Sequence, residues 1–265
     1  MKKSLFENKS VTEQPCSSLL LNGDCLQLLL GIESEYIDLV VTSPPYDELR
    51  KYNNITRSFF GIAEQLVRVL SPGGVIVWNI ADQTKNGTET GTSFRQALFF
   101  MDELGLNLHD TMIWHKTNPM PLTHNRYEQS FEYMFVFSKG KPKTFNPIKV
   151  PCKFAGKINT ARTHRHDLDK LTRFNGYGKT IKDDKIDCNV WKFPISHYDG
   201  HPSAFPLELP TRHIQTWTHE GDMVIDPFMG SGTTGVAAKQ LCRKFVGFEI
   251  DKKYFDIATK RIENC

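Results

Sequence analysis

Two short stretches of the chain carry residue types that could do chemistry, and they lie far apart in the sequence. The first is VVTSPPY, residues 40–46, where the polar tetrad Ser43-Pro44-Pro45-Tyr46 follows an apolar β-branched run. The second is DPFMGSGTTG, residues 226–235, a glycine-rich loop that follows another such run. Because parallel strands present their carboxyl ends to a common crevice, these stretches predict a shared site.

The tetrad suits a planar group that bears N–H bonds. Its prolines remove backbone freedom and backbone donors, which leaves the carbonyls of Ser43 and Pro44, the Ser43 hydroxyl and the Tyr46 ring. Acceptors that hold both protons of an exocyclic base amine out of the ring plane would direct its lone pair toward a methyl donor, and such preorganised groups are the usual source of catalytic power. The alternative is a structural turn with a core tyrosine, which Pro-Pro alone would favour.

The glycine loop predicts a bound nucleoside. Gly230, Gly232 and Gly235 satisfy the pattern G-x-G-x-x-G between an expected strand and an expected helix, where glycines let a ligand approach the free N–H groups of the helix N-terminus. Glu249 ends the next expected strand, where a carboxylate can accept hydrogen bonds from both ribose hydroxyls. The alternative is a tight strand-to-helix turn followed by a surface glutamate.

The residues around this loop favour S-adenosylmethionine over a dinucleotide. The chain ends 16 residues after Glu249, so the second half of an NAD site would have to precede the loop, which is unusual for an NAD enzyme. The loop opens with Asp226, Pro227 and Phe228. An acid and an aromatic ring suit a cationic ligand, with its ammonium and sulfonium groups, better than they suit a pyrophosphate.

Strand and helix patterns alternate along the chain, which predicts an α/β fold with a doubly wound, mostly parallel sheet. The runs at 111–115 and 133–137 have no helix between them, so we expect an antiparallel hairpin at the sheet edge. Helical spacing is found at 60–70, 93–104, 232–241 and 253–262. The seven expected strands are 18–21, 37–42, 75–80, 111–115, 133–137, 223–226 and 244–250.

A basic segment interrupts this alternation. Residues 138–190 hold 13 of the 33 lysines and arginines but only 5 of the 30 acidic residues, which indicates contact with a polyanion. The alternative is a solvated basic loop. We therefore divide the chain into a catalytic half at 1–138, an inserted basic segment at 139–190 and a cofactor-binding half at 191–265.

Several other classes of protein are not indicated. The six cysteines form no Cys-x-x-Cys pair, and His164 and His166 have no partners at ligand spacing, so no metal site is predicted. The Pro-Cys pairs at 15–16 and 151–152 follow no expected strand that faces the crevice, so a covalent cytosine-C5 mechanism is not indicated. The sequence has neither a signal core nor a run that could span a bilayer, and we expect a cytoplasmic protein.

Taken together, TSPPY, DPFMGSGTT and VGFEID resemble the amino-methylating DNA methyltransferases, and the tetrad-first order resembles their permuted β group. The resemblance implies an S-adenosylmethionine-dependent seven-stranded methyltransferase sheet and a target base flipped out of duplex DNA. Residues 139–190 take the place of the target-recognition segment. A homodimer and a cognate restriction endonuclease are further partners that the resemblance leaves open.

Serine at the first position of the tetrad resembles the cytosine-N4 enzymes, whereas the adenine-N6 enzymes mostly carry aspartate there. The prediction is therefore a cytosine-N4 methyltransferase, with an adenine-N6 enzyme as the alternative. A non-catalytic nucleic-acid-binding protein on the same fold is a second alternative, and an NAD oxidoreductase is a more distant one.

The resemblance and the residue chemistry together give the expected site residues. Those expected at the target base are Ser43, Pro44, Pro45 and Tyr46. Those expected at the cofactor are Asp24, His201, Phe205, Asp226, Pro227, Phe228, Gly230, Ser231, Gly232, Thr233 and Glu249. Those expected at DNA are Lys139, Lys141, Lys143, Lys149, Lys153, Arg162, Arg165 and Arg173.

Overall fold

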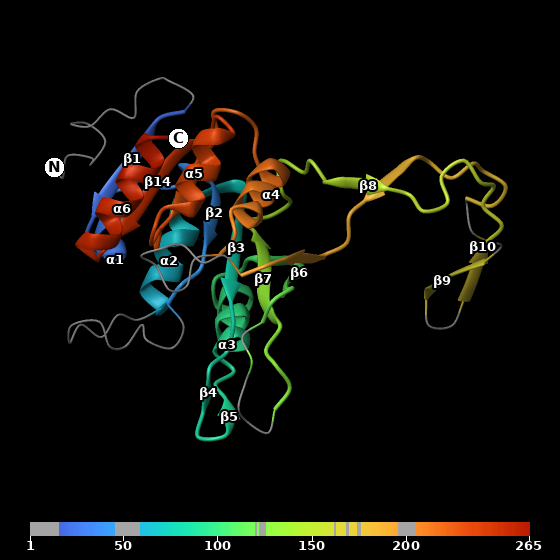
Figure 1. Cartoon of the computed structure of the whole chain (residues 1–265), viewed down its shortest axis with the longest axis horizontal. Coiled ribbons are helices and arrows are strands. Elements are labelled where there is room, and N and C mark those ends of the chain that lie inside the picture. Colours follow the sequence, from blue (N-terminus) through green and yellow to red (C-terminus); the bar gives the residue numbers. More distant parts are fainter. Residues whose placement is uncertain are drawn as a thin grey trace. The chain divides into compact units, whose positions relative to one another are not determined.

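The chain forms two compact units, Met1–Asn146 together with Asn189–Cys265, and Pro147–Cys188 (Figure 1). The computed structural model describes residues 16–45, 59–119, 121, 126–161, 163–167, 170–173, 176–195 and 205–265, with the backbone alone at 163–167 and 170–173.

The larger unit is built on an eight-stranded sheet with the order β1-β14-β13-β2-β3-β7-β6-β12. Strand β7 runs antiparallel to its neighbours β3 and β6, and every other neighbouring pair is parallel. This confirms the predicted doubly wound, mostly parallel α/β fold. The strands are β1 (Ser18–Asn22), β2 (Ile37–Thr42), β3 (Leu70–Ile80), β6 (Asn107–Lys116), β7 (Phe131–Ser138), β12 (Val190–Phe193), β13 (Met223–Asp226) and β14 (Lys244–Glu249).

The edge of the sheet differs from the prediction. The antiparallel pairing of β6 with β7 is confirmed, but β12 pairs in parallel with β6, from Val190 opposite Ile113 to Phe193 opposite Lys116. The hairpin is therefore internal, and the sheet has one strand more than the seven expected. Sequence reasoning missed β12 because only Trp191 and Phe193 of its four residues are buried, so the strand forms no continuous apolar run.

Helices cover both faces of the sheet, as Figure 1 shows. One core cluster joins β-strand side chains to α1, α2 and α3, and the other joins them to α4, α5 and α6. Among the helices that the structure describes, none combines the length and the apolar character needed to cross a membrane. The helices are α1 (Cys25–Leu29), α2 (Phe59–Val69), α3 (Thr92–Leu98) with its π-helical continuation η2 (Phe99–Glu103), α4 (Glu208–Trp217), α5 (Thr233–Gln240) and α6 (Lys252–Glu263).

The central strands are apolar on both faces because both faces are covered. In β3, Ile76 and Trp78 pack with the first core cluster, whereas Val75 and Val77 pack with the second. This alternation is the side-chain geometry of a strand, and a strand buried on both sides reads in the sequence as a continuous apolar run. Helix α2 instead buries every third or fourth residue, including Ile62 and Leu66.

The direction of the chain connections reverses between β13 and β2, which are neighbours in the sheet. After β13 the chain passes through α5 to β14 on one side, and after β2 it passes through α2 to β3 on the other. In open α/β sheets, ligands bind outside the carboxyl ends of the strands at such a reversal. The tetrad follows β2 and the glycine loop follows β13, so both stretches flank this point.

The smaller unit, Pro147–Cys188, has little regular structure. Its two short antiparallel pairs are β8 (Lys149–Pro151) with β11 (Asp184–Ile186), and β9 (Thr163–Asp167) with β10 (Lys170–Arg173). The unit is shorter than the predicted segment 139–190, because residues 139–146 and 189–190 belong to the larger unit.

Candidate active site

The tetrad begins where β2 ends. Strand β2 ends at Thr42, and Ser43, Pro44 and Pro45 follow it without regular structure. Pro44 is buried, whereas Ser43 and Pro45 are half-buried. Tyr46 lies outside the described residues. The structure therefore brings the first part of the tetrad to the carboxyl edge of the sheet, where the sequence predicts it.

The glycines of the loop have separate structural reasons. Gly230 and Gly232 have φ of 50° and 84°, a left-handed conformation that glycine adopts at little cost. Gly235 lies inside α5, where a Cβ atom would be 2.3 Å from Ile262 Cδ1 and 2.6 Å from Phe245 Cε1. The first two glycines shape the loop, and the third allows α5 to pack against α6 and β14.

The rest of the loop is fastened to neighbouring elements. The Met229 N–H donates to the Phe248 carbonyl at 2.9 Å. Arg261 of α6 donates to the carbonyl oxygen of Ser231 at 2.6 Å and to its hydroxyl at 3.0 Å, and reaches the Thr233 hydroxyl at 3.5 Å. Ser231 and Thr233 are buried, so the loop has a fixed shape before any ligand binds.

Glu249 ends β14 beside this loop. Its carboxylate accepts from the Gly230 N–H at 2.9 Å and from the Asp251 N–H at 2.8 Å, one oxygen for each. Burial raises the pKa of Glu249, against the lowering effect of these backbone N–H groups. A carboxylate oxygen has a second lone pair, so both oxygens can still accept from a vicinal diol. The site therefore fits a ribose.

Three of the other residues expected at the cofactor, Asp24, Phe205 and Phe228, are among the described residues. Asp24 is the N-cap of α1, accepting from the Leu26 N–H at 2.8 Å, which is the capping role that an aspartate at a helix start often has. Phe228 and Phe205 are partly buried, and each packs against a core cluster. His201 lies outside the described residues.

Asp226 and Pro227 are buried at the end of β13, and the carboxylate of Asp226 turns inward. Asp226 is 1% exposed, and Thr42, Phe228 and Thr234 all donate to its oxygens. Burial raises its pKa to about 6. The sequence predicted a carboxylate that faces a cationic ligand; the described contacts of Asp226 are instead with the protein.

Sequence reasoning missed a buried polar cluster at the same edge of the sheet. The Asn79 Nδ2 donates to Glu132 Oε2 at 2.6 Å, and Lys116 Nζ lies 2.7 Å from Glu132 Oε1. Asn79 is the penultimate residue of β3 and follows Trp78, whose register partner is Thr42 of β2. Polar residues at the ends of apolar strands were the available signal, in the stretches WNI and FEY.

The basic residues predicted at DNA lie in different environments. Lys139 and Lys143 belong to the larger unit, where Lys139 Nζ lies 3.0 Å from Glu35 Oε1 and Lys143 is paired with Asp38. In the smaller unit, Lys149 pairs with Asp184 at 3.2 Å. Lys141 and Lys153 are exposed. The side chains of Arg162, Arg165 and Arg173 lie outside the described residues.

A turn of the smaller unit presents an aromatic ring close to two ammonium groups. Phe154 is 52% exposed, and the Nζ atoms of Lys153 and Lys157 lie 5.7 and 5.4 Å from its ring centroid. The turn is held to the opposite chain segment by hydrogen bonds from Gly156 N to Ile181 O and from Ile181 N to Lys157 O. Among the described residues, neither lysine has a carboxylate partner.

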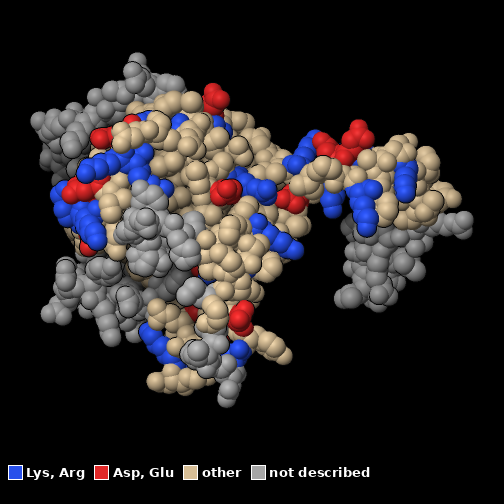
Figure 2. All heavy atoms as spheres, viewed as in Figure 1, with Lys and Arg blue, Asp and Glu red and all other residues tan. Residues whose placement is uncertain are grey.

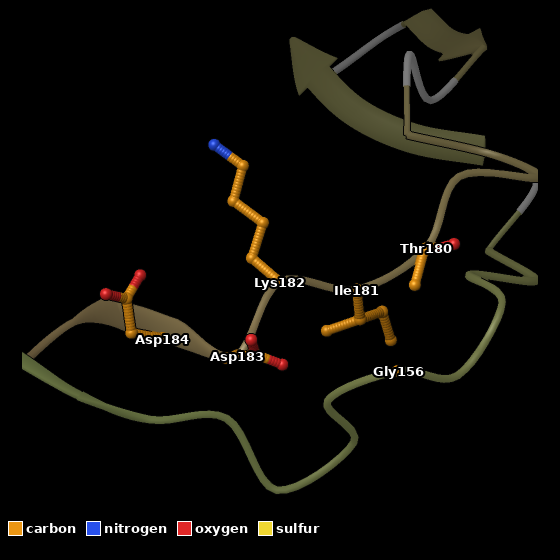
Figure 3. A pocket seen from close by; sticks show the side chains of 6 residues that line it. All are labelled: Gly156, Thr180, Ile181, Lys182, Asp183 and Asp184. Atoms are coloured by element: carbon orange, nitrogen blue, oxygen red, sulfur yellow. The ribbon is translucent and has the colours of Figure 1, made fainter.

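Charge is unevenly placed on this unit. In the view of Figure 2, acidic side chains gather on its upper side, and basic side chains lie both beside them and below them. A hollow in the unit is lined by Gly156, Thr180, Ile181, Lys182, Asp183 and Asp184 (Figure 3). Because two carboxylates line the hollow, it is poorly suited to a phosphate, and the turn at Phe154 is the better polyanion surface.

The comparisons with known proteins agree on the class. The model of the family described as DNA methylase matches residues 37–260, which includes the tetrad, the glycine loop and Glu249. The chain belongs to this family, whose amino-methylating type the sequence predicted. S-adenosylmethionine is accordingly the methyl donor, and DNA is the substrate.

Individual relatives cover most of the chain. The orphan methyltransferase M.BamHII of Bacillus amyloliquefaciens is 46% identical over 86% of this chain and 89% of its own. The type II methyltransferase M.BglII of Bacillus subtilis is 32% identical over 90% of this chain and 67% of its own. Among solved structures, the PvuII DNA methyltransferase, described as cytosine-N4-specific, has a TM-score of 0.71 at 25% identity, covering 92% of this chain and 86% of that one.

Proposed function

We propose that this protein transfers a methyl group from S-adenosylmethionine to the exocyclic N4 amine of a cytosine flipped out of duplex DNA. The observation that carries the proposal is Ser43, at the first position of the tetrad and at the carboxyl end of β2. The likeness to the PvuII enzyme supports the same choice of base. An adenine-N6 enzyme is the competing outcome, because the family includes both.

In this proposal the tetrad holds the target amine. The carbonyl of Pro44 and either the carbonyl or the hydroxyl of Ser43 accept its two N–H bonds, while Pro45 stiffens the turn and Tyr46 stacks on the base. The two acceptors weaken the delocalisation of the lone pair into the ring, and the amine becomes a better nucleophile. Because these groups are fixed before the base arrives, they lower the barrier without reorganisation.

The opposite side of the crevice holds the cofactor, which supplies an electrophilic methyl group on a sulfonium when it is bound. Glu249 accepts from the ribose hydroxyls while it keeps its bond to the Gly230 N–H. Asp24 lies at the end of β1, next in the sheet to β14, and we assign it to the adenine side. The remaining proposed cofactor contacts come from His201, Phe205, Pro227, Phe228, Ser231, Gly232 and Thr233.

We assign recognition of DNA to the segment 139–190, and first to the turn at Phe154. Lys153 and Lys157 supply exposed positive charge, which neutralises phosphates and releases counterions. Phe154 adds a flat apolar surface that can stack on a base or a sugar. Lys139, Lys143 and Lys149 each pair with a carboxylate, so they are weaker phosphate ligands in this arrangement. Lys141 and the three arginines complete the proposed set.

Duplex DNA in the cytoplasm is the only partner that this proposal needs. A homodimer and a companion restriction endonuclease remain predictions. The relative M.BamHII is described as an orphan methyltransferase. Methylation of DNA by this protein would likewise not require a companion nuclease.

Mass spectrometry of nucleosides from host DNA tests the choice of base. Cells that express the protein should contain N4-methylcytosine, and cells that express Ser43→Ala should contain much less of it. N6-methyladenine alone would overturn the choice of base and leave the rest of the site intact. DNA without either product, from cells in which the protein is folded and soluble, would overturn the proposed activity.

A further inference from the structure

Asp226 is a buried carboxylate near the methyl-transfer site that accepts three hydrogen bonds. Its Oδ1 accepts from the Thr42 hydroxyl at 2.6 Å and from the Phe228 N–H at 3.0 Å, and its Oδ2 accepts from the Thr234 hydroxyl at 2.7 Å. Thr42 and Thr234 are 0% exposed. A carboxylate can satisfy three such donors at once without donating in return, which no neutral side chain of this size does.

These donors come from the two sides of the crevice. Thr42 is the last residue of β2 and directly precedes Ser43, whereas Phe228 and Thr234 bracket the glycine loop. Thr42 and Asp226 are 184 residues apart in the sequence. Thr234 also lies 3.5 Å from the Val41 carbonyl of β2. A single buried carboxylate thus joins the strand that carries the tetrad to the loop and helix that bracket the cofactor.

Methyl transfer depends on the distance and angle between donor and acceptor, and a misplacement of about 1 Å can cost on the order of a hundredfold in rate. Backbone pairing between β13 and β2 extends only from Val224–Leu39 to Ile225–Val40. Beyond that pairing, the hydrogen bonds of Asp226 link the end of β2 to the loop after β13. The connection is therefore located where a small shift would change the transfer geometry.

We propose that Asp226 is a positioning residue that sets the separation between the bound methyl donor and the target amine. It acts through Thr42 on the tetrad and through Phe228 and Thr234 on the cofactor loop. This inference rests on the methyltransferase activity of the chain but not on which base receives the methyl group. It replaces the expectation from the sequence that Asp226 contacts a cationic ligand.

Conservative variants test the proposal in the full-length protein. Thr42→Val and Thr234→Val each remove one donor at nearly constant volume. Asp226→Asn keeps one acceptor for Thr42 and Phe228, and Thr234 can then accept from the new amide and turn its own proton toward Val41. We expect single-turnover methyl transfer to slow by about tenfold to a hundredfold, while the affinities for DNA and S-adenosylmethionine stay within about threefold of wild type.

A loss of stability alone would not produce this pattern. Thermal unfolding shows what fraction of each variant is folded, and Thr42→Ser, which keeps the hydroxyl, should restore the rate. Thr42→Val and Thr234→Val should also be strongly non-additive, because both act through the same carboxylate. The control pair is Thr42→Val with Thr259→Val, since the Thr259 hydroxyl bonds only the Phe255 carbonyl among its described partners; this pair should be additive.

Three results would overturn the proposal. The first is wild-type single-turnover rates in Thr42→Val and Thr234→Val. The second is a defect confined to S-adenosylmethionine affinity, which would make Asp226 a cofactor ligand. The third is no recovery in Thr42→Ser. Absence of methylation by the wild-type protein would instead count against the proposed function, so the two failures are distinguishable.

Discussion

The end of β13 and the turn at Phe154 place polar groups in opposite ways. At the end of β13, Asp226 is 1% exposed and receives three hydrogen bonds from two parts of the chain. At the turn, Lys153 and Lys157 are exposed, and their described contacts are with the Phe154 ring. A buried charge must be fully paired, whereas an exposed ammonium is already solvated by water. The first region therefore fixes a geometry, and the second offers charge that a ligand can use.

The two regions should consequently fail in different ways when they are altered. Substitutions where the chain connections reverse, between β13 and β2, should strongly alter cofactor affinity, the rate of methyl transfer or the free energy of unfolding. Changes at the turn should alter the affinity for DNA and its salt dependence, with little effect on folding. The following variants test that distinction.

Glu249→Ala should have the largest effect, on the affinity for S-adenosylmethionine. Two charge-assisted hydrogen bonds to the ribose are lost, together worth about 3 kcal/mol after compensation by water, or on the order of a hundredfold in Kd. Isothermal titration calorimetry measures this affinity for S-adenosylmethionine. Glu263→Ala, at an exposed position of α6, is the matched control and should bind normally. Unchanged affinity in Glu249→Ala would place the ribose elsewhere.

Gly235→Ala should destabilise the larger unit by about 2 kcal/mol, since the new methyl group would overlap Ile262 and Phe245. Gly61→Ala in α2 is the matched control. Its new Cβ would lie 3.6 Å from Leu26, an ordinary contact, and alanine stabilises a helix by about 1 kcal/mol relative to glycine. Urea unfolding of the two variants should therefore move in opposite directions. Equal shifts would contradict the close packing at α5.

The stability of the larger unit should depend on pH through two buried groups with opposite signs. Burial lowers the pKa of His213 to about 3 from 6.5. Its contribution to the free energy of unfolding is therefore present above pH 6.5 and is lost as pH falls below that value. Burial raises the pKa of Asp226 to about 6 from 3.8, so its contribution to the free energy of unfolding grows as pH falls through 6 and is lost as pH rises.

Asp226→Asn removes only the second of these contributions. Between pH 7 and pH 5 the variant should therefore lose about 1 kcal/mol more stability than the wild type. Urea unfolding at the two pH values provides the comparison. Parallel losses in the two proteins would show that Asp226 does not titrate in this range.

The double substitution Lys153→Gln and Lys157→Gln should have the smallest effect, confined to DNA. The slope of log K against log salt should fall by about 1.8, from two phosphate contacts at roughly 0.9 each. The double variant Lys252→Gln and Lys253→Gln changes the charge equally on α6 and should leave the slope unchanged. Equal slopes for all three proteins would move the DNA contact away from this turn.

The sequence predicted the parts of the larger unit that have local signatures. Strands β2 and β13 were predicted to the residue, because continuous apolar runs end in a tetrad or a glycine loop there. Helix α1 has only five residues, and helix α4 carries a proline and polar residues among its buried positions, so neither shows a clear apolar period. Strand β12 was missed because its buried residues, Trp191 and Phe193, alternate with exposed ones and form no continuous apolar run.

The site was predictable in residue types but not in orientation. Motif spacing placed Ser43, Asp226 and Glu249 at neighbouring strand ends. Whether a carboxylate faces a ligand or the protein depends on donors such as Thr42 and Thr234, which are far away in the sequence. The cluster of Asn79, Glu132 and Lys116 likewise forms only when three strands come together. Such tertiary pairings leave no local signal.

Single-turnover methylation over a range of DNA concentrations, with S-adenosylmethionine saturating, tests most directly the division between the two regions. For Thr42→Val, we expect a rate at saturating DNA that is at least about tenfold below wild type, with an unchanged half-saturating DNA concentration. For the double variant at Lys153 and Lys157, we expect the wild-type rate at saturating DNA and a raised half-saturating DNA concentration. A reduced rate at saturating DNA in the lysine variant, or a defect of Thr42→Val that saturating DNA removes, would contradict this division.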